Sequence, residues 1–188
     1  MPPGSASLEP HPISLEEMLD TMALQRLAWT YCHAIDRRDY RLLRSLYHDD
    51  AVDDHGEMFC GTPDQYVAWL PSMLAQWEAT SHVISNTLFL IDGARAEGQL
   101  VTAAYHRSAD GLRELSAHGR YLDVYEKRGG IWKFLRRSLV LDWTSERAVS
   151  TQIEVAGSRL GIAIGRGSNN DPCFLRLPMF SACRTTKA

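Results

Sequence analysis

Two residues far apart in the chain, Asp36 and His82, have the clearest potential for chemistry in this sequence. Asp36 closes an amphipathic stretch that reads YCHAID, and His82 opens a long β-rich region. A carboxylate that binds one ring nitrogen of a histidine leaves the other nitrogen free to act as a base. If the fold joins the two residues, the pair suits removal of a proton next to a carbonyl group without metal or nucleotide. The alternatives are that His82 caps a strand end and that Asp36 is a turn residue.

A capping motif and an apolar stripe predict the helix that carries Asp36. Ser14 and Glu17 match the S-x-x-E capping box, so a helix should begin near Leu15. Its apolar positions follow helical spacing and form one buried stripe, with Asp36 beside it. The stripe consists of Leu24, Leu27, Ala28, Tyr31 and Ile35.

Two further helices and a short strand are predicted before His82. Asp39 should cap a second helix that carries Leu42, Leu43 and Leu46. Residues 51–54 are compatible with a short strand. A third helix should begin at Thr62-Pro63 and run to Trp77, with a kink at Pro71.

After these helices the sequence becomes β-rich. Asp92-Gly93, Asp110-Gly111 and Gly129-Gly130 are hairpin-type turn signals that divide residues 82–143 into four long segments. Helices followed by an antiparallel meander predict an α+β domain with the helices on one face of the sheet. A strongly twisted sheet of long strands can curl into a cone and leave a pocket between sheet and helices.

The composition indicates a single soluble domain with an ordinary core. The chain has 188 residues and a net charge of −3, which gives no electrostatic reason to expect nucleic acid or an anionic membrane as partner. No apolar run approaches the length of a spanning helix, and the N-terminus lacks the pattern of a secretory signal. The four cysteines form no C-x-x-C pair, so a cytoplasmic protein with free thiols is expected; two disulfides are the alternative.

Three regions are predicted along the chain. Residues 1–12 form a disordered leader, residues 13–144 form the domain, and residues 145–188 form a C-terminal extension. The extension is rich in Gly, Ser and Asn and ends in a short apolar piece. It is expected to serve as a lid or an oligomer arm, with a plain surface arm as the alternative.

Four local strings resemble the SnoaL-like branch of the nuclear-transport-factor-2-like superfamily over roughly residues 15–144. They are Tyr-x4-Asp-x-x-Asp at 31–39, LYHDDAV at 46–52, SHVISN at 81–86, and GRYLDVYE at 119–126 followed by GIWKF at 130–134. The resemblance implies a cone-shaped α+β barrel, in which N-terminal helices pack on a strongly curved, mostly antiparallel sheet. It also implies a homo-oligomer, a dimer or a trimer.

Within that superfamily the sequence is similar to a cofactor-free lyase group that includes scytalone dehydratase, bile acid 7α-dehydratase and hexachlorocyclohexane dehydrochlorinase. Asp36 and His82 match an Asp at the end of the first helix and a His at the start of the long sheet. Tyr31 is similar to a catalytic-site tyrosine, Arg137 to a pocket arginine, and His106 to a second histidine. The resemblance implies a dehydratase-like lyase that acts on a small hydrophobic cyclic substrate without a cofactor.

The roles of these residues each have a structural alternative. Tyr31 could be a core tyrosine, and His106 could be a surface strand residue. Alternation from Trp132 places Arg137 on the other face of the last strand from Phe134, with Lys133 and Leu135, and which face lines the pocket is not decidable from the sequence. We predict that His82, Asp36 and Tyr31 are catalytic and that His106, Arg137 and His55 bind substrate.

Other functions remain open at this stage. The run of acids and histidines from His48 to His55 invites a metal site, but such runs are more often solvated, and we expect no metal. An isomerase or cyclase of a polyketide or steroid-like substrate would use the same pocket. A non-catalytic small subunit of a ring-hydroxylating dioxygenase would need no polar set at positions 31, 36 and 82.

Overall fold

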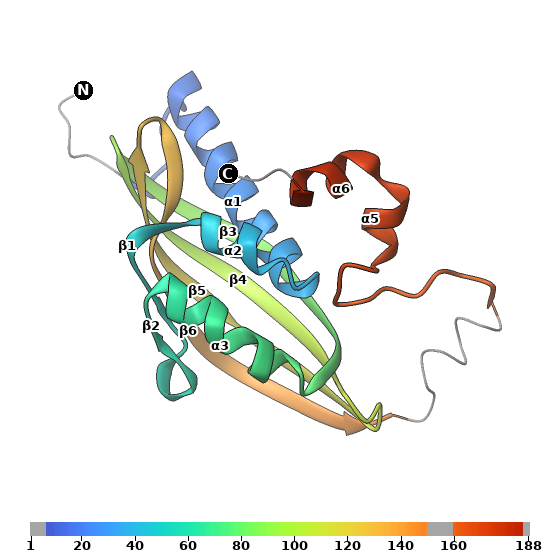
Figure 1. Cartoon of the computed structure of the whole chain (residues 1–188). Helices are drawn as coiled ribbons and strands as arrows, with labels where there is room; N and C mark the ends of the chain where they lie inside the picture. The colour runs from blue at the N-terminus through green and yellow to red at the C-terminus, as the bar shows by residue number, and fades with distance from the viewer. Residues whose placement is uncertain (1–6, 150–159, 186–188) are drawn as a thin grey trace.

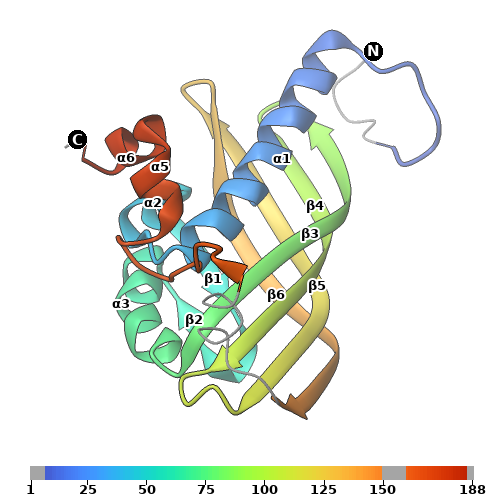
Figure 2. The ribbon, with the colours of Figure 1, turned by 90° about the vertical axis from the view of Figure 1, so that its right-hand side faces the viewer.

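A computed structural model describes residues 7–149 and 160–185 of the chain. Helices lie against one face of a curved, open six-stranded sheet, so the fold is the predicted α+β class (Figures 1 and 2). The helical elements are α1 (Leu15–Asp36), α2 (Tyr40–Ser45), η1 (Gly56–Met58), α3 (Pro63–Leu74), α5 (Pro172–Arg176) and α6 (Pro178–Thr185). The strands are β1 (Tyr47–Asp54), β2 (Cys60–Gly61), β3 (Trp77–Asp92), β4 (Arg95–Ser108), β5 (Arg113–Arg128) and β6 (Ile131–Ala148).

The helices begin where side chains satisfy their free N–H groups. The Ser14 hydroxyl accepts a hydrogen bond from the backbone N–H of Glu17 at the start of α1. The Asp39 carboxylate caps α2 in the same way. Thr62 and Gln65 form a complete capping box at α3. These three starts confirm the helices predicted from the sequence.

The boundary between α3 and β3 differs from the prediction. The helix ends at Leu74 instead of continuing to Trp77, and Trp77 begins a strand that was expected to start at His82. The reason is pairing with the next strand, because β3 already runs opposite β4 from Trp77 and Ser108 onward. Cross-strand pairing of an aromatic residue outweighs its compatibility with the helix.

Strand order in the sheet is β2-β1-β6-β5-β4-β3. The last four strands form the predicted antiparallel meander, and the glycines of its three turns have positive φ angles of 57–81°. β1 is longer than the predicted strand at 51–54 and pairs in parallel with β6, which places Asp53 opposite Arg137. The sheet therefore has β1 near one edge and β3 at the other.

A bulge in β6, opposite His118 and Gly119 of β5, bends the sheet around the helices. The pairing of β5 with β6 shifts register between His118 and Gly119. A Cβ atom at Gly119 would lie 2.1 Å from the carbonyl oxygen of Val140, so no side chain fits there. A bulge of this kind increases strand bending and twist, which favours a concave sheet face. Figure 2 shows α1 lying across that face, with β3 to β6 behind it.

The C-terminal helices α5 and α6 pack beside α1 and α2 (Figure 1). Arg37 at the end of α1 forms an ion pair of 3.0 Å with Asp171, and Arg184 lies 3.3 Å from Asp39. β6 extends to Ala148, beyond the domain end predicted at residue 144. Residues 1–6 of the predicted leader, and 150–159 and 186–188 of the predicted extension, lie outside the described residues. Within the described part of the chain, no helix has the length and apolarity to cross a bilayer.

Candidate active site

The Asp36 carboxylate ends α1 and contacts two residues of β3. Its Oδ1 lies 2.7 Å from the ring Nδ1 of His82 and accepts a hydrogen bond of 2.9 Å from the Thr80 hydroxyl. Its Oδ2 accepts the backbone N–H of His82 at 2.8 Å. Asp36 is 7% exposed, so these hydrogen bonds replace most of its contact with water. The structure thus joins the two residues that the sequence singled out.

The chain direction after Asp36 is fixed by Arg38. This residue has a φ angle of 56°, an uncommon conformation for a residue with a side chain. Its guanidinium donates hydrogen bonds to the carbonyl oxygen of Ile35 at 2.9 Å and to the Thr80 hydroxyl at 2.8 Å. These bonds offset the strain and link the end of the helix to the strand that carries His82.

His82 lies on the wall of a cavity of about 350 Å³ between the helices and the concave sheet face. Most of its lining is apolar and aromatic, which is typical of a site for a small hydrophobic molecule. The apolar lining includes Ile35, Met58, Trp69, Met73, Leu74, Trp77, Leu115, Leu139 and Leu141. The polar lining consists of His55, Tyr66, His82, Thr102, His106, His118, Tyr121 and Thr144. A hollow of about 540 Å³ between α3 and residues 167–170 is larger, but none of the predicted site residues line it.

His106 lies next to His82 in the cavity. The two ring centroids are 5.5 Å apart, and the centroid of the Trp77 ring lies 4.9 Å from that of His106. Burial, followed by the charge of His82, lowers the pKa of His106 to about 4. His106 is therefore a neutral imidazole at neutral pH, able to form hydrogen bonds with a ligand but poorly suited to hold a proton.

His55 also lines the cavity, and it has a carboxylate of its own. Its Nδ1 lies 2.7 Å from Oδ1 of Asp53, which is the distance of an ion pair without the alignment of a hydrogen bond. Oδ2 of Asp53 accepts a hydrogen bond of 2.6 Å from the Tyr47 hydroxyl. The His55 ring stacks on Tyr66 with centroids 5.4 Å apart.

Tyr31 does not line the cavity but contacts a residue that does. It is 1% exposed, and its hydroxyl lies 2.8 Å from that of Tyr66. Burial raises the pKa of both tyrosines well above the ordinary value, so both hydroxyls keep their protons. Any effect of Tyr31 on a molecule in the cavity would pass through Tyr66.

Arg137 is also outside the cavity lining, because its side chain points into the core. Its guanidinium donates two hydrogen bonds, of 2.9 and 2.7 Å, to the Asp123 carboxylate. Tyr31, Tyr121 and Phe134 surround it, with ring centroids 4.0–4.2 Å from the guanidinium carbon. These contacts hold Arg137 inside the core, where it does not line the cavity.

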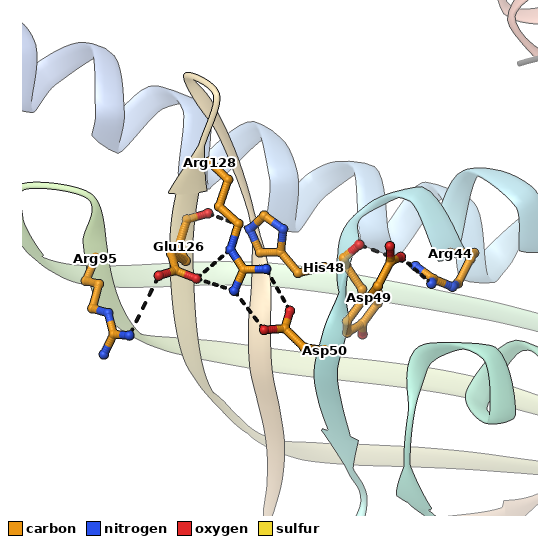
Figure 3. Close-up of polar contacts among 8 residues, drawn as sticks. Arg44, His48, Asp49, Asp50, Arg95, Glu126 and Arg128 are labelled. Carbon is orange, nitrogen blue, oxygen red and sulfur yellow. Dashed lines mark hydrogen bonds and ion pairs between the residues drawn. The ribbon is translucent and has the colours of Figure 1, made fainter.

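The acids of the 48–55 run that face solvent are paired with arginines. Asp50 forms hydrogen bonds of 2.8 and 2.9 Å with Arg128, and Arg44 contacts Asp49 at 2.6 Å (Figure 3). Arg136 contacts Asp54 at 2.7 Å. No group of three or more His, Cys, Asp or Glu side chains suited to a metal ion occurs among the described residues.

The family of the chain follows from comparison with known sequences. The profile of the SnoaL-like domain family matches residues 16–138, which is more than half of the chain. The chain is a SnoaL-like protein. Comparison with curated proteins gives no match.

Solved structures with the same fold support this assignment. A proposed scytalone dehydratase from Novosphingobium aromaticivorans is 26% identical, with a TM-score of 0.64, and the match covers 72% of this chain and 92% of that one. Hexachlorocyclohexane dehydrochlorinase LinA type 3 from Novosphingobium barchaimii is 18% identical, with a TM-score of 0.66, covering 72% and 94%. A proposed aromatic ring hydroxylase from N. aromaticivorans is 20% identical, with a TM-score of 0.63, covering 70% and 94%. The last two matches concern the fold alone.

Two residues of this SnoaL-like site, one that contacts the dyad and one on the cavity wall, were missed in the sequence. Thr80 holds Asp36, and its position two residues before His82 on a strand places both side chains on one face, which was a usable signal. Tyr66 lies on the helical stripe with Trp69 and Met73, and that pattern indicates burial without distinguishing core from cavity wall.

Proposed function

We propose that this protein is a cofactor-independent lyase that eliminates water from a small hydrophobic cyclic substrate. His82 is the general base and removes a proton next to a carbonyl group. The contact between Asp36 and His82 on the wall of an apolar cavity carries this proposal. The SnoaL-like family and the similarity to a proposed scytalone dehydratase support a small-molecule lyase or isomerase.

The geometry of the dyad suits a base. When Nδ1 of His82 donates its hydrogen to Asp36, Nε2 is left with a lone pair for the substrate. The carboxylate then stabilises the imidazolium that forms after proton transfer. Acid–base catalysis by a positioned side chain typically supplies about 10²–10⁴-fold. The same carboxylate holds the backbone of His82, so ring and strand are oriented together.

The Tyr31–Tyr66 pair can stabilise the carbonyl oxygen of the substrate as it gains negative charge. Tyr66 is on the cavity wall and keeps its proton, so its hydroxyl can donate to an enolate-like oxygen. Tyr31 is then a positioning residue that orients the Tyr66 hydroxyl from the core. His106, neutral and adjacent to His82, is placed to bind a substrate oxygen.

An isomerase or cyclase would use the same base and cavity, and product mass separates the two reactions because isomerisation leaves mass unchanged. A purely structural small subunit has no need for two histidine–carboxylate contacts at one cavity. Purification of the protein as a stable homo-oligomer, without a larger partner, would further oppose that alternative.

The test uses 3-hydroxy-1-tetralone, a bicyclic hydroxy ketone that becomes fluorescent 1-naphthol when it loses water. The wild type should form 1-naphthol, and His82→Ala and Asp36→Asn should each reduce turnover by about 10²-fold or more. His11→Gln is the matched control, because His11 lies on an exposed segment before α1 and contacts Glu17. Full turnover in His82→Ala or Asp36→Asn would contradict the proposed roles.

A further inference from the structure

The cavity contains a second histidine–carboxylate pair that the mechanism above leaves unused. His55 follows β1, near one edge of the sheet, whereas His82 lies on β3, at the other edge. Both rings line the same cavity, and Tyr121 of the intervening strand β5 lies between their strands in the sheet order. A molecule in this cavity can thus contact two imidazoles that come from widely separated parts of the sheet.

The surroundings of the two carboxylates differ in a way that bears on their roles. Asp36 shares its charge among the ring of His82, the backbone N–H of His82 and the Thr80 hydroxyl. Asp53 is 0% exposed and, among the described residues, accepts a hydrogen bond from Tyr47 and has an ion-pair contact with His55. The geometry suits a proton donor, because a buried carboxylate 2.7 Å from Nδ1 can stabilise positive charge on the His55 ring.

Two tyrosines next to the His55–Asp53 pair stay neutral. Burial, followed by the charge of Asp53, raises the pKa of Tyr47 well above its ordinary value, so Tyr47 remains a neutral donor. Tyr66, stacked on His55 from α3, also keeps its proton. The printed distances thus place the His55 ring against the Asp53 carboxylate and the neutral Tyr66 phenol, with neutral Tyr47 bound to the same carboxylate.

We propose that His55, held by Asp53, is a second catalytic residue that protonates the leaving hydroxyl group while His82 removes the carbon-bound proton. This inference rests on the proposed lyase function. The C–H electron pair forms the new C=C bond, the C–O bond breaks, and the departing oxygen takes the Nε2 proton of His55 to leave as water. His82 ends the step protonated and His55 neutral, and exchange with solvent restores both.

The chemistry of the leaving group gives a direct test. Both 3-hydroxy-1-tetralone and 3-acetoxy-1-tetralone yield 1-naphthol after loss of the same ring proton. Hydroxide needs a proton in order to leave, whereas acetate leaves as a stable anion. His55→Gln should therefore lower kcat for the hydroxy ketone by about 10²-fold and change kcat for the acetoxy ketone by less than about threefold. His82→Gln should lower both, because both reactions need the base.

The pH dependence of the wild type provides a second readout. One deprotonated and one protonated imidazole give a bell-shaped profile for the hydroxy ketone. The acetoxy ketone needs no proton donor, so its turnover should fall only on the acid side of the profile. Any residual turnover of the hydroxy ketone by His55→Gln should likewise show no fall on the alkaline side. Asp53→Asn should act in the same direction as His55→Gln.

The two ketones separate a loss of the proton donor from a loss of the base or of the fold. Retained turnover of the acetoxy ketone by His55→Gln demonstrates that the variant folds and that the base is intact. Equal losses on both ketones, or no loss on either, would refute a proton-donating role for His55 while leaving the His82 dyad standing. Failure of the wild type to convert either ketone would overturn the proposed function itself, and this inference with it.

Discussion

The carboxylate of Asp36 holds His82 at two points, the ring Nδ1 at 2.7 Å and the backbone N–H at 2.8 Å. The backbone N–H can only donate, so whichever atom faces it must be an acceptor. This fixed donor makes the consequence of a change at Asp36 predictable.

The substitution Asp36→Asn should switch the tautomer of His82. The amide oxygen of the new side chain must face the backbone N–H, which turns the NH₂ group toward Nδ1. Nδ1 then becomes an acceptor and the ring proton moves to Nε2, which removes the base. Ring ¹⁵N NMR shifts at neutral pH should show Nδ1 protonated in the wild type and Nε2 protonated in the variant. The same tautomer in both proteins would contradict this geometry.

The Thr80 hydroxyl should contribute measurably to stability as well as to the site. Thr80→Val keeps the side-chain shape but removes a donor to Asp36 and an acceptor for Arg38, at a cost of about 1–3 kcal/mol in unfolding free energy. Urea unfolding measures this change, and Thr80→Ser is the matched control because it retains the hydroxyl. A valine variant as stable as the wild type would mean that the bond has no net value.

His106 should make the protein sensitive to acid. Its pKa is lowered from 6.5 to about 4 by burial and by His82, so the unfolded chain binds more protons than the folded one between these values. Stability should therefore rise with pH across this window, by roughly 2–3 kcal/mol. Urea unfolding at pH 7 and pH 4.5 should show a smaller acid-induced loss in His106→Gln than in the wild type. Equal losses in the two proteins would exclude His106 as the source.

Local signals in the sequence were sufficient for most of the fold. Caps at Ser14, Asp39 and Thr62 set the helix starts, and glycines with positive φ set the hairpins. The pairing of β1 with β6 has no local signal, because it joins segments far apart in the chain. That pairing places Asp53 of β1 opposite Arg137 in the interior. The burial of Asp53 beside His55, which follows β1, could therefore not be foreseen.

The candidate site was predictable in part for a similar reason. The position of a side chain near the start or end of an element is set largely by that element. Asp36 is the last residue of α1, and His82 lies early in β3. The direction of a side chain from a buried stripe depends on packing partners. The stripe therefore indicated that Tyr31 is buried, but not that its hydroxyl meets Tyr66 behind the cavity wall. Alternation on β6 predicted that Arg137 and Phe134 lie on opposite faces, which is wrong. A bulge at Leu135 shifts the register, and both side chains are buried in contact with each other.

The position of Arg137 separates a structural role from a substrate-binding one. The side chain is 0% exposed and its charge is balanced by Asp123, which is 2% exposed. Arg137→Met should lower the unfolding free energy by about 3–5 kcal/mol, because it leaves the Asp123 carboxylate buried without its partner. Adding Asp123→Asn to Arg137→Met should recover part of this loss, since the stranded charge is removed.

Urea unfolding of the wild type, the two single variants and the double variant gives the coupling energy of the pair. Arg137→Lys is the matched control for charge, and it should still be destabilised, because an ammonium group cannot form both hydrogen bonds to one carboxylate or stack among three aromatic rings. The KM of the folded Arg137→Lys protein for 3-hydroxy-1-tetralone should stay close to that of the wild type. An unchanged unfolding free energy together with a raised KM would instead place Arg137 in contact with substrate.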